Sequence, residues 1–419
     1  MKTQLEAQLE RQLEALHKRV AGIDVHRMKH VVTVLIEDIT GNLTRHIHEF
    51  GGFTRDLKVM AAWLCELDVE LVILESTGIY WKSLYAQLEN AGLEIWVINA
   101  HHIKNVPGRK TDVGDSEWLA QLGRYGLVRP SFIPPKDLRE LRLISRYRRK
   151  LENMRSAETN RLHKVLDDAG IKLGGLVSDI NGKAARAMVD GLIDGLAPSE
   201  LIKLSGRLQA PKESLLASLE GDLSARHHLV LEEIRMHLDE LERHLEKLDD
   251  YLRNAMAPYT WAWTLLQTIP GIDEISAALI LIEIGDDLSH FSSADRFASW
   301  AALCPGNNES AGKRKSGKTR KGNSILRYLL CEAANGAIRT QSVFREKYHG
   351  LVVRRGHKKA IVAIAHKMIR TIYFMFTRHE AYHDTGFDYA AANVKKNAPR
   401  WIKALKTFGY VVKRSTAVA

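Results

Sequence analysis

The order of strand and helix signals between residues 20 and 125 is the feature that most limits how this chain can fold. Three strand-like segments joined by short turns come first, and helical and strand patterns then alternate. We expect strands at 20–26, 29–38, 42–50, 70–75 and 94–99, and helices at 54–67, 79–90 and 112–125. Three hairpin-linked strands followed by this alternation predict a mixed α/β sheet.

That order of elements is the one found in RNase H-like folds. After residue 135 the strand signals stop, and the remaining patterns are mostly helical. We expect an N-terminal amphipathic helix at 1–18, the mixed α/β domain at 19–130, a helical domain at 131–258, a mainly helical C-terminal domain at 259–390 and a tail at 391–419.

Six apolar residues in the middle of the chain repeat at spacings of 4, 3, 4, 3 and 4. They are Ile234, Leu238, Leu241, Leu245, Leu248 and Leu252. This is an a/d seam over about three heptads, the pattern of a coiled coil. It predicts either a coiled-coil hairpin or dimer contact, or a helix that lies on the protein's own core. The spacing does not separate these interpretations.

The stretch GKRKSGKT at 312–319 matches the phosphate-loop pattern G-x-x-x-x-G-K-[ST]. A true phosphate loop follows a buried strand and opens a helix, whereas the preceding residues CPGNNESA contain Pro305, Gly306 and four polar residues. We therefore interpret the match as a coincidence of Gly and Lys richness. What remains is six basic residues in the nine positions 313–321, which form either a solvated surface loop or a loop that binds a phosphodiester backbone.

The charge balance favours polyanionic partners. Lys and Arg total 61 against 50 Asp and Glu, which gives a net charge of +11 and a pI of about 9.4. No apolar run approaches the roughly 20 residues that span a bilayer, and the N-terminus has no apolar signal core. Cys65, Cys304 and Cys331 show no C-x-x-C spacing, which fits a reducing cytoplasm. We expect a cytoplasmic, nucleoid-associated protein with no membrane partner.

The segment TIPGIDEISAALILIEIGD at 268–286 has the pattern of two helices joined by a P-G-I turn. It resembles a helix-hairpin-helix motif, whose glycine-containing turn presents backbone N–H groups to a DNA phosphate. Gly271 is therefore a candidate contact to nucleic acid. A P-G turn between helices is also common in other proteins, so the motif alone is a weak signal.

Four carboxylates occupy positions that an RNase H-like sheet would bring together. Asp24 lies at the end of the first strand, and Glu75 ends the strand LVILE. Asp112 and Asp115 begin a helix, and their i, i+3 spacing puts both on one helix face. Crowded carboxylates repel unless a cation lies between them, and hard oxygen ligands suit Mg²⁺. Taken singly, these acids have simpler interpretations. Asp24 could cap a turn, Glu75 could pair with Lys82, and Asp112 could be a helix N-cap.

With these residues in hand, the sequence resembles the DEDD-type insertion-sequence transposases of the IS one-ten (IS110) family from about residue 20 to residue 389. The motifs GIDVH, LESTGIYW and KTDVGDSEWLA resemble the family's RuvC-like domain and match its four acids at Asp24, Glu75, Asp112 and Asp115. The motifs IPGIDEISAALILIEIGD, CPGNNESAGKRKSGKTRKGN and KKAIVAIAHKMI resemble its transposase domain.

The resemblance implies a DNA transposase with Ser310, in the NNES motif, as its nucleophile and Mg²⁺ at the four acids. It also implies a structured guide RNA encoded by the element's own end, and a coiled-coil-bearing homo-oligomer, a tetramer built from two dimers. Ser316 is the nearest rival nucleophile, because it too lies in the basic run. We expect these residues to bind nucleic acid: Lys313, Arg314, Lys315, Lys318, Arg320, Lys321, Gly271, Arg354, Arg355, Lys358 and Lys359.

Two other functions remain open. In a metal-dependent nuclease of the Holliday-junction type, the carboxylates act on a metal-activated water and Ser310 is only a loop residue. In a non-catalytic nucleic-acid-binding scaffold, the acids are caps and salt-bridge partners. Dependence on a divalent metal separates the scaffold from both enzymes, and a covalent protein–DNA adduct separates the recombinase from the nuclease.

Overall fold

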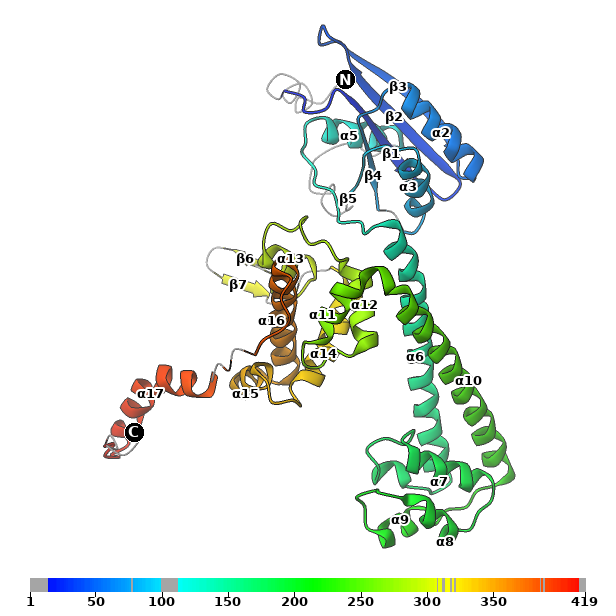
Figure 1. The fold of residues 1–419 in the computed structure, drawn as a ribbon, viewed down its shortest axis with the longest axis vertical. Coiled ribbons are helices and arrows are strands. Elements are labelled where there is room, and N and C mark those ends of the chain that lie inside the picture. Colours follow the sequence, from blue (N-terminus) through cyan, green and yellow to red (C-terminus); the bar gives the residue numbers. More distant parts are fainter. Residues whose placement is uncertain are drawn as a thin grey trace. The chain divides into compact units, whose positions relative to one another are not determined.

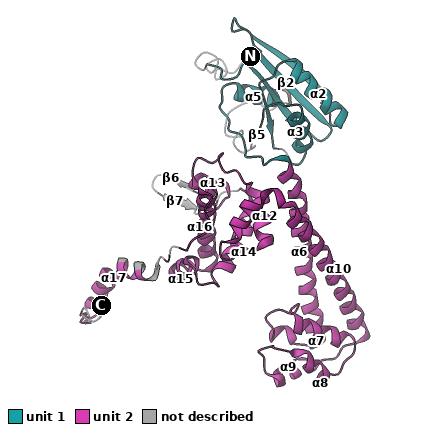
Figure 2. Cartoon of the chain, in the orientation of Figure 1, with its two compact units in different colours: residues 1–136 teal, residues 137–419 magenta. Residues whose placement is uncertain are grey.

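The computed structural model describes most of the chain, in two compact units (Figure 2). The described residues are 14–76, 78–98, 112–306, 308–310, 313–316, 319, 322–384, 386 and 389–413. Unit 1 spans Met1–Lys136 and unit 2 spans Asp137–Ala419. Each unit has its own apolar core, so each is considered by itself.

Unit 1 contains a five-stranded sheet with the strand order β3-β2-β1-β4-β5. The strands are β1 (Arg19–Val25), β2 (Lys29–Glu37), β3 (Leu43–Gly51), β4 (Leu71–Glu75) and β5 (Ile95–Ile98). β1 pairs antiparallel with β2 and parallel with β4, β2 pairs antiparallel with β3, and β4 pairs parallel with β5. The predicted mixed α/β sheet is confirmed, and its first and fourth strands are neighbours.

Helices cover both faces of this sheet (Figure 1). They are α2 (Thr54–Glu66), α3 (Trp81–Asn90) and α5 (Asp112–Arg124). Buried side chains of α2 and α3 pack on one face, and Leu119 and Ala120 of α5 pack on the other. Because both faces are covered, the central strands are almost uninterrupted runs of apolar residues.

The start of the chain differs from the expected helix at 1–18. Its described part, residues 14–18, has no helical structure. The backbone N–H groups of Leu16 and His17 instead donate to the carbonyl oxygen of Arg124, at 2.9 and 3.3 Å, and the chain then enters β1. The rest of the expected helix lies outside the described residues.

Unit 2 begins with two long helices that pack as an antiparallel hairpin, α6 (Lys136–Asp168) and α10 (Ala225–Ala255) (Figure 1). Leu241 and Leu245 of the heptad seam lie against Leu151 of α6. The seam therefore forms a coiled-coil hairpin within one chain, and in this structure it is not a surface left free for a dimer partner.

Short helices close the far end of this hairpin. They are η1 (Leu173–Gly175), α7 (Lys183–Ile193), α8 (Pro198–Leu201), η2 (Ile202–Ser205) and α9 (Lys212–Ser218). They share one apolar cluster with the neighbouring ends of α6 and α10. Segment 170–222 is thus a small helical cap within the helical domain expected at 131–258.

The rest of unit 2 is a helical core that carries one small β-hairpin. Its elements are η3 (Ala257–Tyr259), α11 (Thr260–Gln267), α12 (Glu274–Ile284), α13 (Ala294–Trp300), β6 (Asn308–Ser310), β7 (Lys313–Ser316), α14 (Ser324–Ala337), α15 (Val343–Arg355), α16 (His357–Arg378) and α17 (Tyr389–Thr407). α17 occupies most of the segment that we expected to be a tail.

Helix α16 is the centre of this core and contacts α11, α13, α14 and α15. It buries nine apolar side chains. Among the described residues it is also the one helix long and apolar enough to cross a bilayer, although half of that window is buried inside the protein. We expected no such segment, and the apolar composition of α16 follows from its place in the core.

Candidate active site

Strand register and side-chain alternation place Asp24 and Glu75 on the same face and at the same end of the sheet. β1 and β4 run parallel in a register that, continued by one residue, sets Asp24 beside Glu75. Successive side chains on a strand point to opposite faces. Gly22 and Ile73 both lie against α5, and each stands two residues before one of the acids. Both acids therefore share the face that α5 covers.

The course of α5 brings its first turn to the same place. Gly123, near the end of α5, packs against Val20 at the start of β1. Gly22, further along β1, lies against Ser116, near the start of α5; a Cβ built on Gly22 would be 2.0 Å from the Ser116 carbonyl oxygen. α5 therefore runs antiparallel to β1, because its C-terminal part lies beside the start of β1 and its N-terminal part lies further along that strand. The first turn, with both of its aspartates, extends toward the ends of β1 and β4.

The side chains at this edge are partly solvent-accessible. The Asp24 side chain is 19% exposed, and its Oδ2 lies 2.9 Å from Nε2 of His26. Glu75 and Asp115 are half-buried, and the Asp112 side chain lies outside the described residues. Among the side chains that the structure describes, no group of three or more His, Cys, Asp or Glu is close enough to hold a metal ion. The backbone places Asp24, Glu75 and the first turn of α5 at one edge, and the described side chains there do not form a ligand set.

Ser310 is the last residue of β6 and lies opposite Lys313, the first residue of β7. We expected an irregular loop here, and the structure has a two-stranded antiparallel hairpin instead. Only two residues, Ala311 and Gly312, separate the strands in sequence, and so short a connection with a glycine favours a hairpin. The side chains of β6 and β7 lie outside the described residues.

The basic run is only partly described. Arg314 and Lys315 belong to β7, whereas Lys318, Arg320 and Lys321 lie outside the described residues. The next described helix, α14, begins eight residues after β7. This context agrees with the interpretation that the phosphate-loop pattern is a coincidence.

Gly271 has a packing role in the turn between α11 and α12. Its φ of +85° favours glycine, and a Cβ there would lie 2.2 Å from the Ala333 carbonyl oxygen and 2.4 Å from the Ala337 nitrogen, both on α14. The turn therefore requires glycine whether or not it touches DNA. Its expected contact with nucleic acid stays a prediction.

The four cations Arg354, Arg355, Lys358 and Lys359 flank the junction between α15 and α16, and all are exposed. The junction residue Gly356 has a φ of +73°. Cations at a helix N-terminus oppose the helix dipole, so Lys358 and Lys359 are unfavourably placed unless an anion lies nearby. This arrangement suits a bound phosphate.

A second group of cations is partly buried between α15 and α16. Burial lowers the pKa of the Lys347 ammonium, and the charges of Lys367 and Arg370 lower it further. Burial likewise lowers the pKa of His366, with contributions from Arg370 and Lys347. Arg370 Nε lies 3.4 Å from an oxygen of Asp295, which is 73% exposed. Positive charge thus exceeds negative charge in this part of unit 2.

The arginines of α6 are less available than the sequence indicated. The segment 136–164 carries ten Lys and Arg against four Asp and Glu. Arg148, however, pairs with Asp249 of α10, and Arg149 stacks over the ring of Tyr328 at 4.1 Å. Part of this positive charge therefore stabilises the hairpin and is not free for phosphate contacts.

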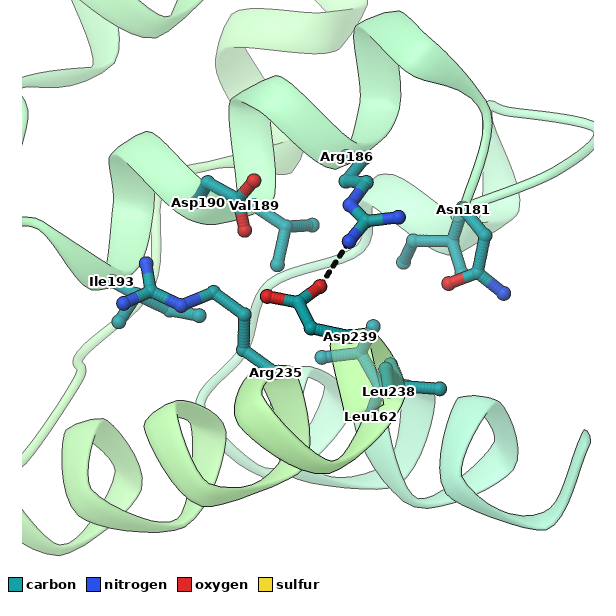
Figure 3. Close-up of a pocket in the computed structure, with 10 residues that line it drawn as sticks. Leu162, Asn181, Arg186, Val189, Asp190, Ile193, Arg235, Leu238 and Asp239 are labelled. Atoms are coloured by element: carbon teal, nitrogen blue, oxygen red, sulfur yellow. Dashed lines mark hydrogen bonds and ion pairs between the residues drawn. The ribbon is translucent and has the colours of Figure 1, made fainter. Parts of the chain in front are cut away.

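A pocket in the helical cap lies far along the chain from the acids and is charge-balanced (Figure 3). Arg186 reaches toward Asp239 and also pairs with Glu242 at 2.5 Å. Arg235 lies 3.3 Å from Asp194. Because both arginines already have carboxylate partners, the pocket lacks the excess positive charge that a phosphate site needs.

Two residues near the base of the β6–β7 hairpin make buried contacts that the sequence did not predict. They are Glu283, in the LIEIGD motif, and Asn323, which caps α14. Asn323 carried a recognisable signal, because an asparagine before an apolar helical pattern is a typical N-cap. Nothing in the sequence marked Glu283, since burial of a single acid in an apolar helix is set by tertiary packing.

Comparison with known proteins gives two family matches. Residues 21–171 match a transposase family profile named for DEDD transposases of IS110, and residues 263–349 match the profile described as "Transposase IS116/IS110/IS902 family". The two matches together cover more than half of the chain. The fold and these matches define the protein as an insertion-sequence transposase, an enzyme that cuts and rejoins DNA. It belongs to the IS110 family.

Individual relatives agree with that assignment. The chain is 24% identical over 350 residues to the "Transposase for insertion sequence element IS1111A" of Coxiella burnetii, covering 80% of this chain and 86% of the relative. It is 25% identical to the "Transposase for insertion sequence element IS1328" of Yersinia enterocolitica, covering 70% and 79%. Among solved structures, T. thermophilus RuvC in complex with a Holliday junction substrate matches 27% of this chain and 99% of its own, at 12% identity and a TM-score of 0.23, a level that carries no argument.

Proposed function

We propose that the enzyme cuts and rejoins DNA through a covalent intermediate on Ser310, assisted by a divalent cation, Mg²⁺, held by the four acids. The observation that carries this proposal is the convergence of Asp24, Glu75 and the start of α5 on one edge and one face of the sheet. Acids crowded in this way repel one another unless a cation offsets their charge.

The residues at this edge fit a hard divalent cation. All four donors are carboxylate oxygens, and those whose side chains are described are half-buried, which leaves room for a substrate. When bound, such a cation would polarise a phosphodiester and stabilise charge on an attacking or leaving oxygen. Asp24 and Glu75 would hold it from the strands, and Asp112 and Asp115 from the helix.

The chemical step balances without an external energy source. The Ser310 hydroxyl oxygen forms a bond to phosphorus, and the bond from that phosphorus to one deoxyribose oxygen breaks. The serine gives up one proton, and the leaving oxygen takes one up. A hydroxyl on another strand then reverses the step, so the phosphodiester energy is conserved. Cations of the basic run, such as Lys313 and Arg314, would hold the phosphate and offset its developing charge.

Replacing Ser310 is the direct test. Ser310→Ala should abolish strand cleavage and leave DNA binding almost unchanged, because only one hydroxyl is removed. Ser316→Ala is the matched control and should weaken cleavage only. Asp115→Ala should also stop cleavage, through the loss of a cation ligand. The measurement is a denaturing gel of labelled DNA followed by mass spectrometry of the trapped peptide.

The outcome of that experiment separates two enzymes. A DNA-linked peptide containing Ser310 supports the serine recombinase. Free DNA ends without an adduct, with cleavage persisting in Ser310→Ala, would transfer the function to the metal-dependent nuclease in which the carboxylates act alone.

We also propose that an RNA encoded by the element guides the enzyme to its DNA. The net charge of +11 and the exposed cations around Gly356 support a large polyanionic partner. DNA cleavage should then require the cognate RNA. Efficient site-specific recombination by RNA-free protein would contradict guidance and leave the chemistry of Ser310 untouched.

The working form is proposed to be a homo-oligomer, a dimer or a tetramer of two dimers. Leu143, Tyr147 and Met154 of α6 are exposed at helical spacing, on the outside of the α6–α10 hairpin. An exposed apolar stripe of this kind supports an interface. Tyr147→Lys should lower the mass measured by light scattering, whereas Ile39→Lys, also at an exposed apolar residue, should not. Equal masses for both variants would exclude this stripe as the interface.

A further inference from the structure

Glu283 is a completely buried carboxylate near the end of α12, and the proposed chemistry does not use it. Its side chain is 0% exposed. One oxygen, Oε2, accepts a hydrogen bond from Nδ2 of Asn323 at 2.7 Å and lies 3.3 Å from Nη2 of Arg142. The other, Oε1, has no hydrogen-bond partner, and Nη2 of Arg146 lies 3.9 Å away. A carboxylate this deeply buried is costly unless its partners are held in place.

Asn323 joins this carboxylate to the helix that follows the serine hairpin. Its Oδ1 accepts hydrogen bonds from the backbone nitrogens of Ile325 and Leu326, both at 3.1 Å, and so caps α14. Its Nδ2 is left to donate to Glu283. One side chain therefore sets where α14 begins and ties that point to α12.

The neighbouring residues close the base of the hairpin. Thr319, after β7, forms a bridge with Pro305, before β6, and its hydroxyl oxygen accepts a hydrogen bond from Nη1 of Arg327 at 3.0 Å. Gly322 fits closely against α13: a Cβ there would lie 2.7 Å from the Cβ of Ala302 and 2.9 Å from the Trp300 carbonyl oxygen. Both arms that lead to β6 and β7 are thus fixed to the helical core.

Arg142 couples this base to the long helix α6. Its guanidinium donates to the carbonyl oxygens of Ile282 and Glu283, at 3.3 and 2.8 Å, so a cation caps the C-terminal end of α12. Burial lowers the pKa of Arg142, and the charge of Glu283 opposes that effect. The chain of contacts runs from α6 through Glu283 and Asn323 to the arm that carries β7.

We propose that Glu283 and Asn323 are positioning residues for DNA cleavage, which fix the base of the β6–β7 hairpin and so the place that Ser310 occupies. This inference rests on the proposed role of Ser310. In this proposal, neither residue contacts DNA or the reacting atoms. They act by keeping the nucleophile aligned, where an error of about 1 Å costs roughly a hundredfold in rate.

Three variants separate positioning from simple stability. Asn323→Ser keeps an N-cap oxygen and loses the donor to Glu283. Asn323→Asp keeps the cap but sets a second carboxylate against Glu283. The double variant Asn323→Asp with Glu283→Gln exchanges donor and acceptor and restores the hydrogen bond. At saturating DNA, we expect the single-turnover cleavage rate to fall about tenfold in Asn323→Ser, which loses a hydrogen bond to a charged group, and about a hundredfold in Asn323→Asp, which also sets two carboxylates in contact. The rate should recover in part in the double variant, because the hydrogen bond returns while Arg142 loses its carboxylate partner.

Two further measurements keep the inference falsifiable. The Kd for DNA should be unchanged in Asn323→Ser and in the double variant, which both keep the wild-type net charge. Hydrogen exchange at the amides of β6 and β7 should quicken in the single variants and slow again in the double one. A parallel loss of DNA affinity would show that Asn323 contacts phosphate, and wild-type rates in Asn323→Asp would also overturn the proposal. If Ser310→Ala stays active, the role of Ser310 as nucleophile is wrong, but hydrogen exchange still shows whether Glu283 and Asn323 hold the hairpin. The two proposals can therefore fail separately.

Discussion

The two groups of residues that we propose for catalysis are held in different ways. In unit 1, the acids stand on a sheet edge and a helix whose places are set by continuous backbone pairing and by close packing at Gly22. In unit 2, Ser310 stands on a two-stranded hairpin whose described contacts with the core lie at its base. Cation ligands need fixed spacing, whereas a nucleophile that forms and releases a covalent bond must be able to move. The acids are thus held along whole elements, whereas the proposed nucleophile is held through the base of its hairpin.

The strongest test of this comparison is Gly22→Ala. The added Cβ would meet the Ser116 carbonyl oxygen at 2.0 Å and the Ala120 nitrogen at 2.5 Å, so α5 must shift together with its two aspartates. We expect a loss of about 3 kcal/mol in stability, cleavage near background and weakened Mg²⁺ binding by calorimetry. Gly175→Ala is the control, since a Cβ there meets nothing within 4 Å and the residue has no positive φ. Normal cleavage in Gly22→Ala would break the idea of a rigid acid edge.

Gly271→Ala should have the next largest effect, because the new Cβ would collide with the backbone of α14 beneath the hairpin. We expect a loss of about 2 kcal/mol in the stability of unit 2, measured by denaturant unfolding. Gly356→Ala has a similar positive φ but an open surrounding, so it isolates the backbone strain. Equal losses for the two variants would show that packing on α14 contributes little.

Replacing Lys358 and Lys359 by Ala should weaken nucleic-acid binding moderately and raise the stability of the free protein slightly, since both cations oppose the dipole of α16. Both cations are exposed at the start of α16. Each phosphate that the variant no longer neutralises should reduce the slope of log K against log salt by about 0.9 on duplex DNA. Filter-binding titrations at several salt concentrations give that slope. An unchanged slope would remove the α15–α16 junction from the binding surface.

The smallest expected effect concerns His30, which is buried in β2 with Nδ1 lacking a hydrogen-bond partner. Burial lowers its pKa, and the nearby His26 lowers it further. As pH falls, the His30 side chain therefore takes up a proton in the unfolded chain before it does so in the folded protein. The free energy of unfolding should fall as pH drops below about 6.5, by at most about 1.4 kcal/mol per pH unit. In His30→Phe the Tm should depend less on pH between about 7.5 and about 5.5, the range around the ordinary pKa of histidine. An identical pH profile would assign the effect to other groups.

The sheet was predictable because its information is local. Strand and helix patterns gave β1 to β5, α2, α3 and α5 to within about two residues of the observed bounds. The neighbouring positions of Asp24 and Glu75 follow from the strand order of that fold. What sequence periodicity could not supply was the contact of Glu283 with Asn323 and Arg142, which are 40 and 141 residues away. The β6–β7 hairpin was missed because its strands are short and polar, without the alternation that marks a strand.

The antiparallel course of α6 and α10 has a consequence for where the molecule tolerates change. Moving ten residues along α6, from Arg148 to Glu158, moves the partner twelve residues back on α10, from Asp249 to His237. The start of α6 and the end of α10 therefore lie at the same end of the hairpin, next to the helical core. The length of the hairpin can change without altering the contacts at that end. Removing one heptad from each helix should shorten the arm by about 10 Å while keeping the seam in phase. In evolutionary terms, this arm is a spacer whose reach can be adjusted without rebuilding the catalytic core.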